Sequence, residues 1–157
     1  MNKARLLTGI REEWARWEAS LDGMDEVQMT RPGVTGVWSV KDIIAHITWF
    51  EREMVDMLQA RALTGSDLWQ LPANQRNARI FEENRDRPLD EVVAEAKRVH
   101  QQLFEGVEAL AEDDLVDPHW FPGMPEDWKP WKVIAENSSE HYRDHSRDVR
   151  TWLEKLE

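Results

Sequence analysis

Four segments of the sequence repeat apolar residues at intervals of three and four, which is the spacing of one face of an α-helix. These segments cover approximately residues 2–21, 39–65, 88–111 and 131–157. No long segment alternates apolar and polar residues as a half-buried strand does. Long helices with one apolar face bury that face against one another, so the sequence predicts an all-α four-helix bundle. We expect the 157 residues to form a single domain, 1–157.

The connections between these segments carry the residues that interrupt helices. The stretch 22–37 holds three glycines and a proline, and the stretch 112–130 holds four prolines, so neither can be helical throughout. The stretch 66–88 is polar, with a short helical pattern at about 73–85. We therefore expect one short extra helix in the long connection between the second and third long helices.

The charge and the residue types argue against several classes of function. The formal net charge is -11, and such a field repels phosphate backbones and anionic lipids, so we expect no nucleic-acid and no membrane partner. No apolar run approaches the roughly 20 residues that cross a bilayer. The N-terminal residues show no secretory signal pattern, so a cytoplasmic location is expected. Because the chain has no cysteine, any metal must be held by His, Asp or Glu.

Three histidines lie at positions where apolar residues would be expected. His141 and His145 are four residues apart in the last segment, so their side chains lie one above the other on its apolar face. His46 lies at the edge of the apolar face of the second segment, and such edges meet inside a bundle. Buried imidazoles need polar partners and cannot readily all be protonated. We therefore predict a divalent metal site of His46, His141 and His145 with an open position for water or substrate.

Other polar residues have candidate roles around this predicted site. Asp144 and Asp148 lie on the same side of the last segment and could accept hydrogen bonds from ring N–H groups. His100 lies within the apolar face of the third segment, and we interpret it as a core or supporting residue. His119, in the proline-rich connection, is interpreted as a surface or lid residue. The alternative is that all these histidines only form hydrogen bonds with their neighbours.

Two stretches of the sequence resemble signatures of the DinB/YfiT-like superfamily, namely GVWSVKDIIAHITWFE at 36–51 and WKVIAENSSEHYRDH at 131–145. A third stretch, 77–91, is similar to the DfsB/ClbS branch of that superfamily. The likeness follows all four predicted helices in order. It implies a DinB-like up-down bundle with a long crossover. It also implies a metal held by one histidine of the second helix and a His-x-x-x-His pair of the fourth, here His46, His141 and His145.

The resemblance carries further expectations about chemistry. Zinc or nickel is the metal in many members, which makes these the expected ions. Activities in the superfamily include transfer and isomerisation that depend on a low-molecular-weight thiol such as bacillithiol, mycothiol or glutathione. The colibactin-protection member of the DfsB/ClbS branch opens a cyclopropane hydrolytically. Many members pair through their helices, which implies a homodimer as one candidate assembly.

Three functions fit these observations. The first is a metal-dependent enzyme that acts on a small electrophile by hydrolysis or thiol transfer, with Glu53 as general base and Asn137 orienting the substrate. Its pocket would be lined by Trp49, Trp120 and Trp128, and the connection 112–130 would form a lid. The second is a protein that sequesters a reactive small molecule for self-protection without turnover. The third is a structural bundle without a metal.

Overall fold

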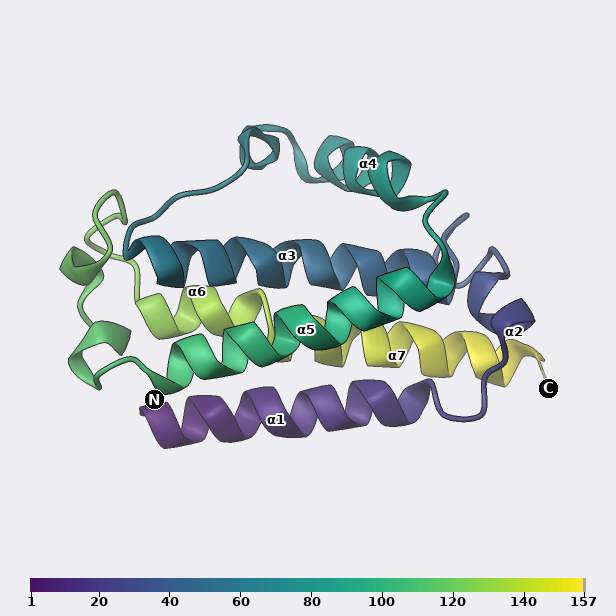
Figure 1. Cartoon of the computed structure of the whole chain (residues 1–157), viewed down its shortest axis with the longest axis horizontal. Helices are drawn as coiled ribbons and strands as arrows, with labels where there is room; N and C mark the ends of the chain where they lie inside the picture. Colours follow the sequence, from purple (N-terminus) through teal and green to yellow (C-terminus); the bar gives the residue numbers. More distant parts are fainter. Residues whose placement is uncertain (157) are drawn as a thin grey trace.

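Four long helices lie side by side in the computed structural model, which describes residues 1–156 (Figure 1). These helices are α1 (Lys3–Ser20), α3 (Val40–Ala60), α5 (Leu89–Glu108) and α7 (Ser139–Leu156). The shorter elements are α2 (Glu26–Thr30), η1 (Asp67–Gln70), α4 (Ala73–Asn84), η2 (Asp113–Leu115), η3 (Pro118–Trp120) and α6 (Pro130–Glu136). Residues 1–156 contain no strand, and their one isolated bridge joins Thr35 to Trp38. The prediction of an all-α bundle is confirmed.

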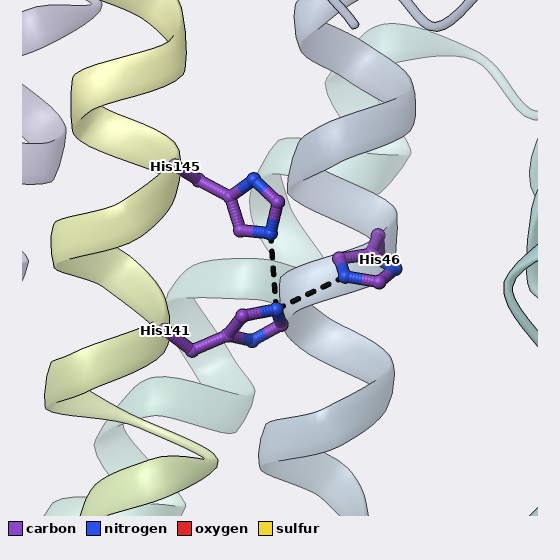
Figure 2. A group of neighbouring side chains, drawn as sticks. All are labelled: His46, His141 and His145. Carbon is purple, nitrogen blue, oxygen red and sulfur yellow. Dashed lines mark hydrogen bonds between the residues drawn. The ribbon is translucent and has the colours of Figure 1, made fainter. Parts of the chain in front are cut away.

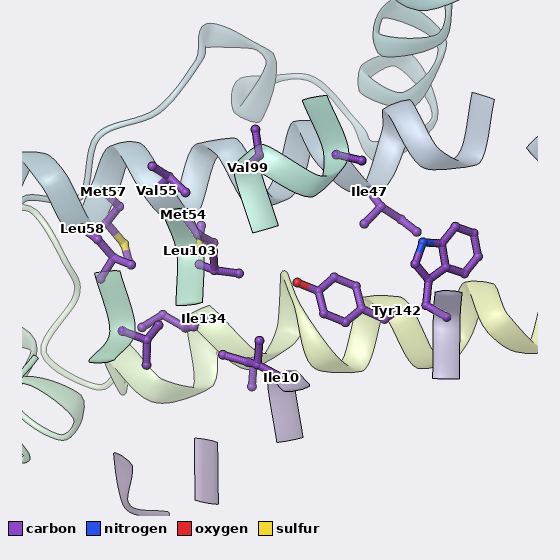
Figure 3. Packing of buried hydrophobic residues seen from close by; sticks show 14 of the residues in the cluster. Ile10, Ile47, Met54, Val55, Met57, Leu58, Val99, Leu103, Ile134 and Tyr142 are labelled. Carbon is purple, nitrogen blue, oxygen red and sulfur yellow. The ribbon is translucent and has the colours of Figure 1, made fainter. Parts of the chain in front are cut away.

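The bundle is built from two helix pairs. Helix α3 packs most extensively against α5, and α1 packs most extensively against α7. The crossover of residues 61–88 runs back along the outside of α3, so α5 runs in the same direction as α3 (Figure 1). Apolar side chains from both pairs and from α6 fill the space between them (Figure 3), and the fully buried ones include Leu6, Ile10, Ile43, Ile47, Met57, Leu103 and Ile134. No helix of residues 1–156 combines the length and apolar composition needed to cross a membrane.

Helix α3, which carries His46, has well-defined ends. Ser39 and Asp42 form a capping box, in which each side chain accepts a hydrogen bond from the backbone N–H of the other residue. The helix ends at Ala60, earlier than the sequence pattern suggests, because Arg61 takes a left-handed conformation with φ of 53°. The guanidinium of Arg61 pairs with Asp114 at 2.9 Å and ties this end of α3 to η2.

The last predicted helix is divided into α6 and α7 at Asn137 and Ser138. The Asn137 Nδ2 donates to the carbonyl of Val133 at 2.9 Å, and the Ser138 Oγ donates to the carbonyl of Ile134 at 2.6 Å. Side chains that bond to the carbonyls of the preceding turn compete with the helical pattern and bend or break it. The sequence therefore starts a new helix directly before His141.

Candidate metal centre

Three imidazoles from α3 and α7 converge between the helices (Figure 2). The Nε2 atom of His141 lies 3.0 Å from the Nε2 of His46 and 3.0 Å from the Nε2 of His145. All three ring nitrogens lie within 4.8 Å of one another. The spacing of four residues places His141 and His145 on one face of α7, and α3 presents His46 to that face.

The donor set and its geometry fit a divalent cation. In a tetrahedral zinc site with Zn–N bonds of about 2.0–2.1 Å, neighbouring ligand nitrogens are about 3.3 Å apart. Two of the three Nε2 pairs, each at 3.0 Å, are close to that separation. The Nδ1 of His145 lies 3.1 Å from the Oδ2 of Asp148. A carboxylate at Nδ1 holds the ring proton there and leaves the Nε2 lone pair free to bind a metal.

Burial keeps these imidazoles neutral. It lowers the pKa of His46 to about 2, and the neighbouring His141 and His145 contribute to the shift. Burial, followed by the influence of His145, lowers the pKa of His141 to about 3. Burial also lowers the pKa of His145, although Asp148 opposes the change. Neutral imidazole is the form that binds a metal, so the site is ready to accept a cation without losing protons.

The tautomers of His46 and His141 also bear on whether their Nε2 atoms can share a cation. Within residues 1–156, the Nδ1 atoms of His46 and His141 are buried and have no hydrogen-bond partner. If both protons lie on these Nδ1 atoms, the Nε2 lone pairs of the two rings face each other at 3.0 Å. Such lone pairs repel, and a shared cation would turn this repulsion into two favourable bonds.

Aromatic rings surround the imidazoles. The ring of Phe50 lies 4.9 Å from that of His46 and 4.8 Å from that of His141. The ring of Trp38 lies 4.9 Å from that of His46, and Phe81 of α4 stacks on Trp38 with 6.3 Å between ring centroids. The sequence analysis did not assign these three residues to the site, although the spacing of four between His46 and Phe50 already places these two side chains next to each other on one helix.

The three tryptophans predicted to wall the pocket occupy other positions. Trp49 packs against Phe50 and Trp69, with ring centroids 4.9 Å and 5.2 Å away, on the side of α3 that faces the crossover. Trp120 and Trp128 are 48% and 43% exposed and belong to the connection 112–130.

The connection 112–130 covers the far end of α3, where the backbone N–H of Leu63 donates to the carbonyl of Pro122 at 2.9 Å. That end of the helix, at Ala60, is about 21 Å from His46 along the helix axis. The structure therefore brings neither Trp120 nor Trp128 to the imidazoles, nor the connection that was expected to act as a lid.

The two predicted catalytic residues make structural hydrogen bonds. Glu53 lies about 10 Å from His46 along the axis of α3. Its buried Oε1 accepts from the backbone N–H of Ser66 at 2.6 Å and from the Nε1–H of Trp69 at 2.7 Å. Asn137 donates its amide to the carbonyl of Val133 at the break between α6 and α7. The structure does not bring Glu53 to the imidazoles, and Asn137 lies one turn before His141.

The other two histidines lie outside the converging group. The Nδ1 of His100 lies 3.1 Å from the hydroxyl of Tyr142 and 3.3 Å from the Oε2 of Glu51, within the bundle. His119 is exposed, and its Nδ1 lies 2.8 Å from Asp117. Both positions agree with the interpretation of His100 as a core residue and of His119 as a surface residue.

A four-helix bundle whose interior carries three converging histidines defines a class of candidate metal-binding proteins. The chain belongs to the DinB superfamily, whose sequence model matches residues 10–148. This confirms the resemblance, and three histidines in such a bundle could hold a metal ion. No curated protein sequence matches the chain.

Several solved structures share the fold. A protein from Streptococcus pneumoniae superposes with a TM-score of 0.83 at 15% identity, covering 98% of this chain and 91% of its own. The colibactin self-resistance protein ClbS superposes with a TM-score of 0.79 at 16% identity, covering 96% of this chain and 94% of its own. The sibling lethal factor precursor DfsB superposes with a TM-score of 0.76 at 15% identity, covering 99% of this chain and 97% of its own. These likenesses establish the fold.

The expectation of no nucleic-acid partner is wrong for this fold, because ClbS was solved in complex with double-stranded DNA. Net charge sums over the whole surface, whereas phosphate contacts depend on local groups of basic side chains. Here the exposed Arg143, Arg147 and Arg150 follow one face of α7 at intervals of four and three residues. The net charge of -11 therefore does not exclude such a partner.

Proposed function

We propose that this protein is a metal-dependent enzyme that acts on a small electrophile. In this proposal His46, His141 and His145 hold a zinc or nickel ion. The observation that carries it is the convergence of three neutral imidazoles, of which His46 is buried and the other two half-buried, with the Nε2 of His141 3.0 Å from each of the other two. Membership in the metal-associated DinB superfamily supports the same reading.

Different residues at the site would bind the ion, orient a ligand and contact the substrate. Three histidine ligands leave a tetrahedral ion one position for water, a thiol or substrate. A divalent cation held by these histidines would lower the pKa of a bound water or thiol and would polarise the substrate. Asp148 holds the His145 ring in one tautomer through its contact at 3.1 Å. Phe50 and Trp38, packed against the imidazoles, exclude water and favour apolar parts of a substrate.

The candidate nucleophiles are water and a low-molecular-weight thiol. We propose that the protein accepts one of these two and uses no side chain as a covalent nucleophile. Support comes from the sequence, which has no cysteine. Support also comes from the position of Glu53, whose carboxylate is engaged by Ser66 and Trp69.

The test begins with metal content. Protein purified without a histidine tag should contain close to one equivalent of zinc or nickel by elemental analysis, and His46→Ala should lose it. Metal-loaded protein is then incubated with epoxides and alkyl halides, with and without glutathione or bacillithiol. Product formation beyond one equivalent, lost in His46→Ala, would support the enzyme. Consumption limited to one equivalent would support sequestration, and metal-free protein with no affinity for zinc or nickel would refute the proposal.

A further inference from the structure

A second buried polar cluster lies in the core between α3 and α7. Each long helix contributes one residue to it: Trp14 from α1, Glu51 from α3, His100 from α5 and Tyr142 from α7. The indole of Trp14 stacks on the imidazole of His100, with centroids 3.9 Å apart and planes 8° from parallel. Trp14 also meets the edge of Tyr142 at 5.3 Å. Figure 3 shows Tyr142 among the core side chains between α3 and α7.

Polar contacts at the centre of this cluster join the two helix pairs. The Nδ1 of His100 lies 3.1 Å from the Tyr142 hydroxyl and 3.3 Å from the Glu51 Oε2. The side chains of Glu51 and Tyr142 are both fully buried. Burial raises the pKa of the Glu51 carboxyl, and its hydrogen bond with His100 offsets part of the rise. Buried polar groups of this kind are stable only while their partners stay within hydrogen-bond distance, so the contacts fix how the pairs fit together.

The same fit determines the geometry of the three imidazoles. His46 belongs to the pair α3/α5, whereas His141 and His145 belong to the pair α1/α7. Tyr142 directly follows His141, and Glu51 lies about 7.5 Å from His46 along the axis of α3. A shift of α7 against α3 would therefore break the contacts of Tyr142 and change the separation of His46 and His141 together.

We propose that Glu51 and Tyr142 are positioning residues, which set α7 against α3 and thereby hold the Nε2 atoms of His46 and His141 at bonding distance from a shared ion. His100 links the two side chains, and Trp14 packs on His100 from the outside. The metal part of this inference rests on the function proposed above, but the arrangement of the rings does not require a bound ion.

Three variants test the proposal: Tyr142→Phe, Glu51→Leu and Glu51→Gln. The first two remove polar contacts, whereas glutamine keeps the shape and an amide oxygen that can accept a hydrogen bond. Zinc affinity, measured by competition with a chromophoric chelator, should fall about tenfold in Tyr142→Phe and Glu51→Leu, the lower end of the range for groups that orient metal ligands. Glu51→Gln should retain the affinity of the unmodified protein.

A metal-independent measurement separates this proposal from the proposed function. Ring resonances of His46 and His141, recorded by NMR on metal-free protein, should move in Tyr142→Phe while those of the exposed His119 stay in place. If the unmodified protein binds no zinc, the metal function fails and these resonances still decide the positioning role. Tyr142→Phe loses only a hydroxyl, so it serves as the deciding variant if Glu51→Leu does not fold.

A control for general destabilisation comes from the opposite end of the bundle. Asp114 is buried and accepts from Arg61 at 2.9 Å and from the backbone N–H of Ala111 at 2.8 Å. Asp114→Asn should lower the melting temperature without changing zinc affinity or the ring resonances of His46 and His141. The proposal is overturned if Tyr142→Phe and Glu51→Leu leave zinc affinity and these ring resonances unchanged. It is also overturned if they alter the two quantities no more than Asp114→Asn does.

Discussion

The Nδ1 atom of His145 lies 3.1 Å from the Oδ2 of Asp148, three residues further along α7. This contact distinguishes His145 from His46 and His141, whose Nδ1 atoms are buried without a partner among residues 1–156. A ring held by a carboxylate at Nδ1 is already in the tautomer that binds a metal through Nε2. The site therefore contains one ring that a carboxylate orients and two rings whose Nδ1 atoms have no polar group to orient them.

The first prediction concerns Asp148. Replacing it with alanine should lower zinc affinity about tenfold, because the His145 ring loses the group that fixes its tautomer and orientation. Competition titration with a chelator measures the change. Asp144→Ala is the matched control, because Asp144 is an exposed carboxylate on the same helix. Equal losses in the two variants would mean that negative charge near the site matters and the contact with His145 does not.

The second prediction concerns His141, whose Nε2 lies 3.0 Å from both other imidazole nitrogens. His141→Ala should lose most of the bound metal, because a cation would keep only two separated ligands. Elemental analysis measures the metal, and far-UV circular dichroism should show nearly unchanged helix content. His119→Ala removes an exposed histidine and should change neither. Full metal content in His141→Ala would remove this residue from the site.

The third prediction concerns the stability of the metal-free protein in acid. The pKa values of His46 and His141 in the folded state, about 2 and about 3, lie below the value of about 6.5 for an unfolded chain. As the pH falls below about 6.5, the unfolded state therefore takes up protons first and the free energy of unfolding decreases. Each histidine lowers the free energy of unfolding by up to about 1.4 kcal/mol for each unit by which the pH falls. This decrease continues until the pH nears the pKa of that histidine in the folded state.

Urea unfolding between pH 7.5 and pH 4.5 measures this dependence. Carboxylates also contribute to acid unfolding, so the informative quantity is the difference between the unmodified protein and His46→Gln. Glutamine cannot take up a proton, and the variant should lose stability less steeply over this range. Identical slopes would show that His46 is not held neutral in the folded state.

Much of the fold and the centre of the site could be predicted because they depend on local spacing. The intervals of three and four define the long helices, and the same periodicity places His141 and His145 on one inward face. His46 is predicted from its place at the edge of the apolar face of α3. Helix α3 does present this residue to the rings of His141 and His145. The capping box of Ser39 and Asp42 also depends on local spacing, because the two residues are three apart at the start of α3.

The surroundings of the site depend on long-range packing, which spacing does not reveal. The predicted walls Trp120 and Trp128 lie in a connection at the other end of α3. The aromatic side chains near the site include Phe81 of α4, which stacks on Trp38, and its position there depends on the path of the crossover. Asn137 was expected to face a substrate, but an amide that can bond to a carbonyl of its own preceding turn does so.

The last prediction concerns Glu53 and separates a general base from a structural anchor. The Glu53 Oε1 accepts from the Ser66 N–H at 2.6 Å and from the Trp69 Nε1–H at 2.7 Å. Glutamine provides an oxygen in the same place but cannot act as a base, so Glu53→Gln should preserve both stability and turnover. Glu53→Ala leaves two donors without a partner, which should cost about 1–3 kcal/mol of unfolding free energy and speed proteolysis within residues 62–72. Urea unfolding and limited chymotrypsin digestion measure these effects, because residues 62–72 contain Leu and Trp but no Lys or Arg. Loss of turnover in a stable Glu53→Gln protein would restore the role of base.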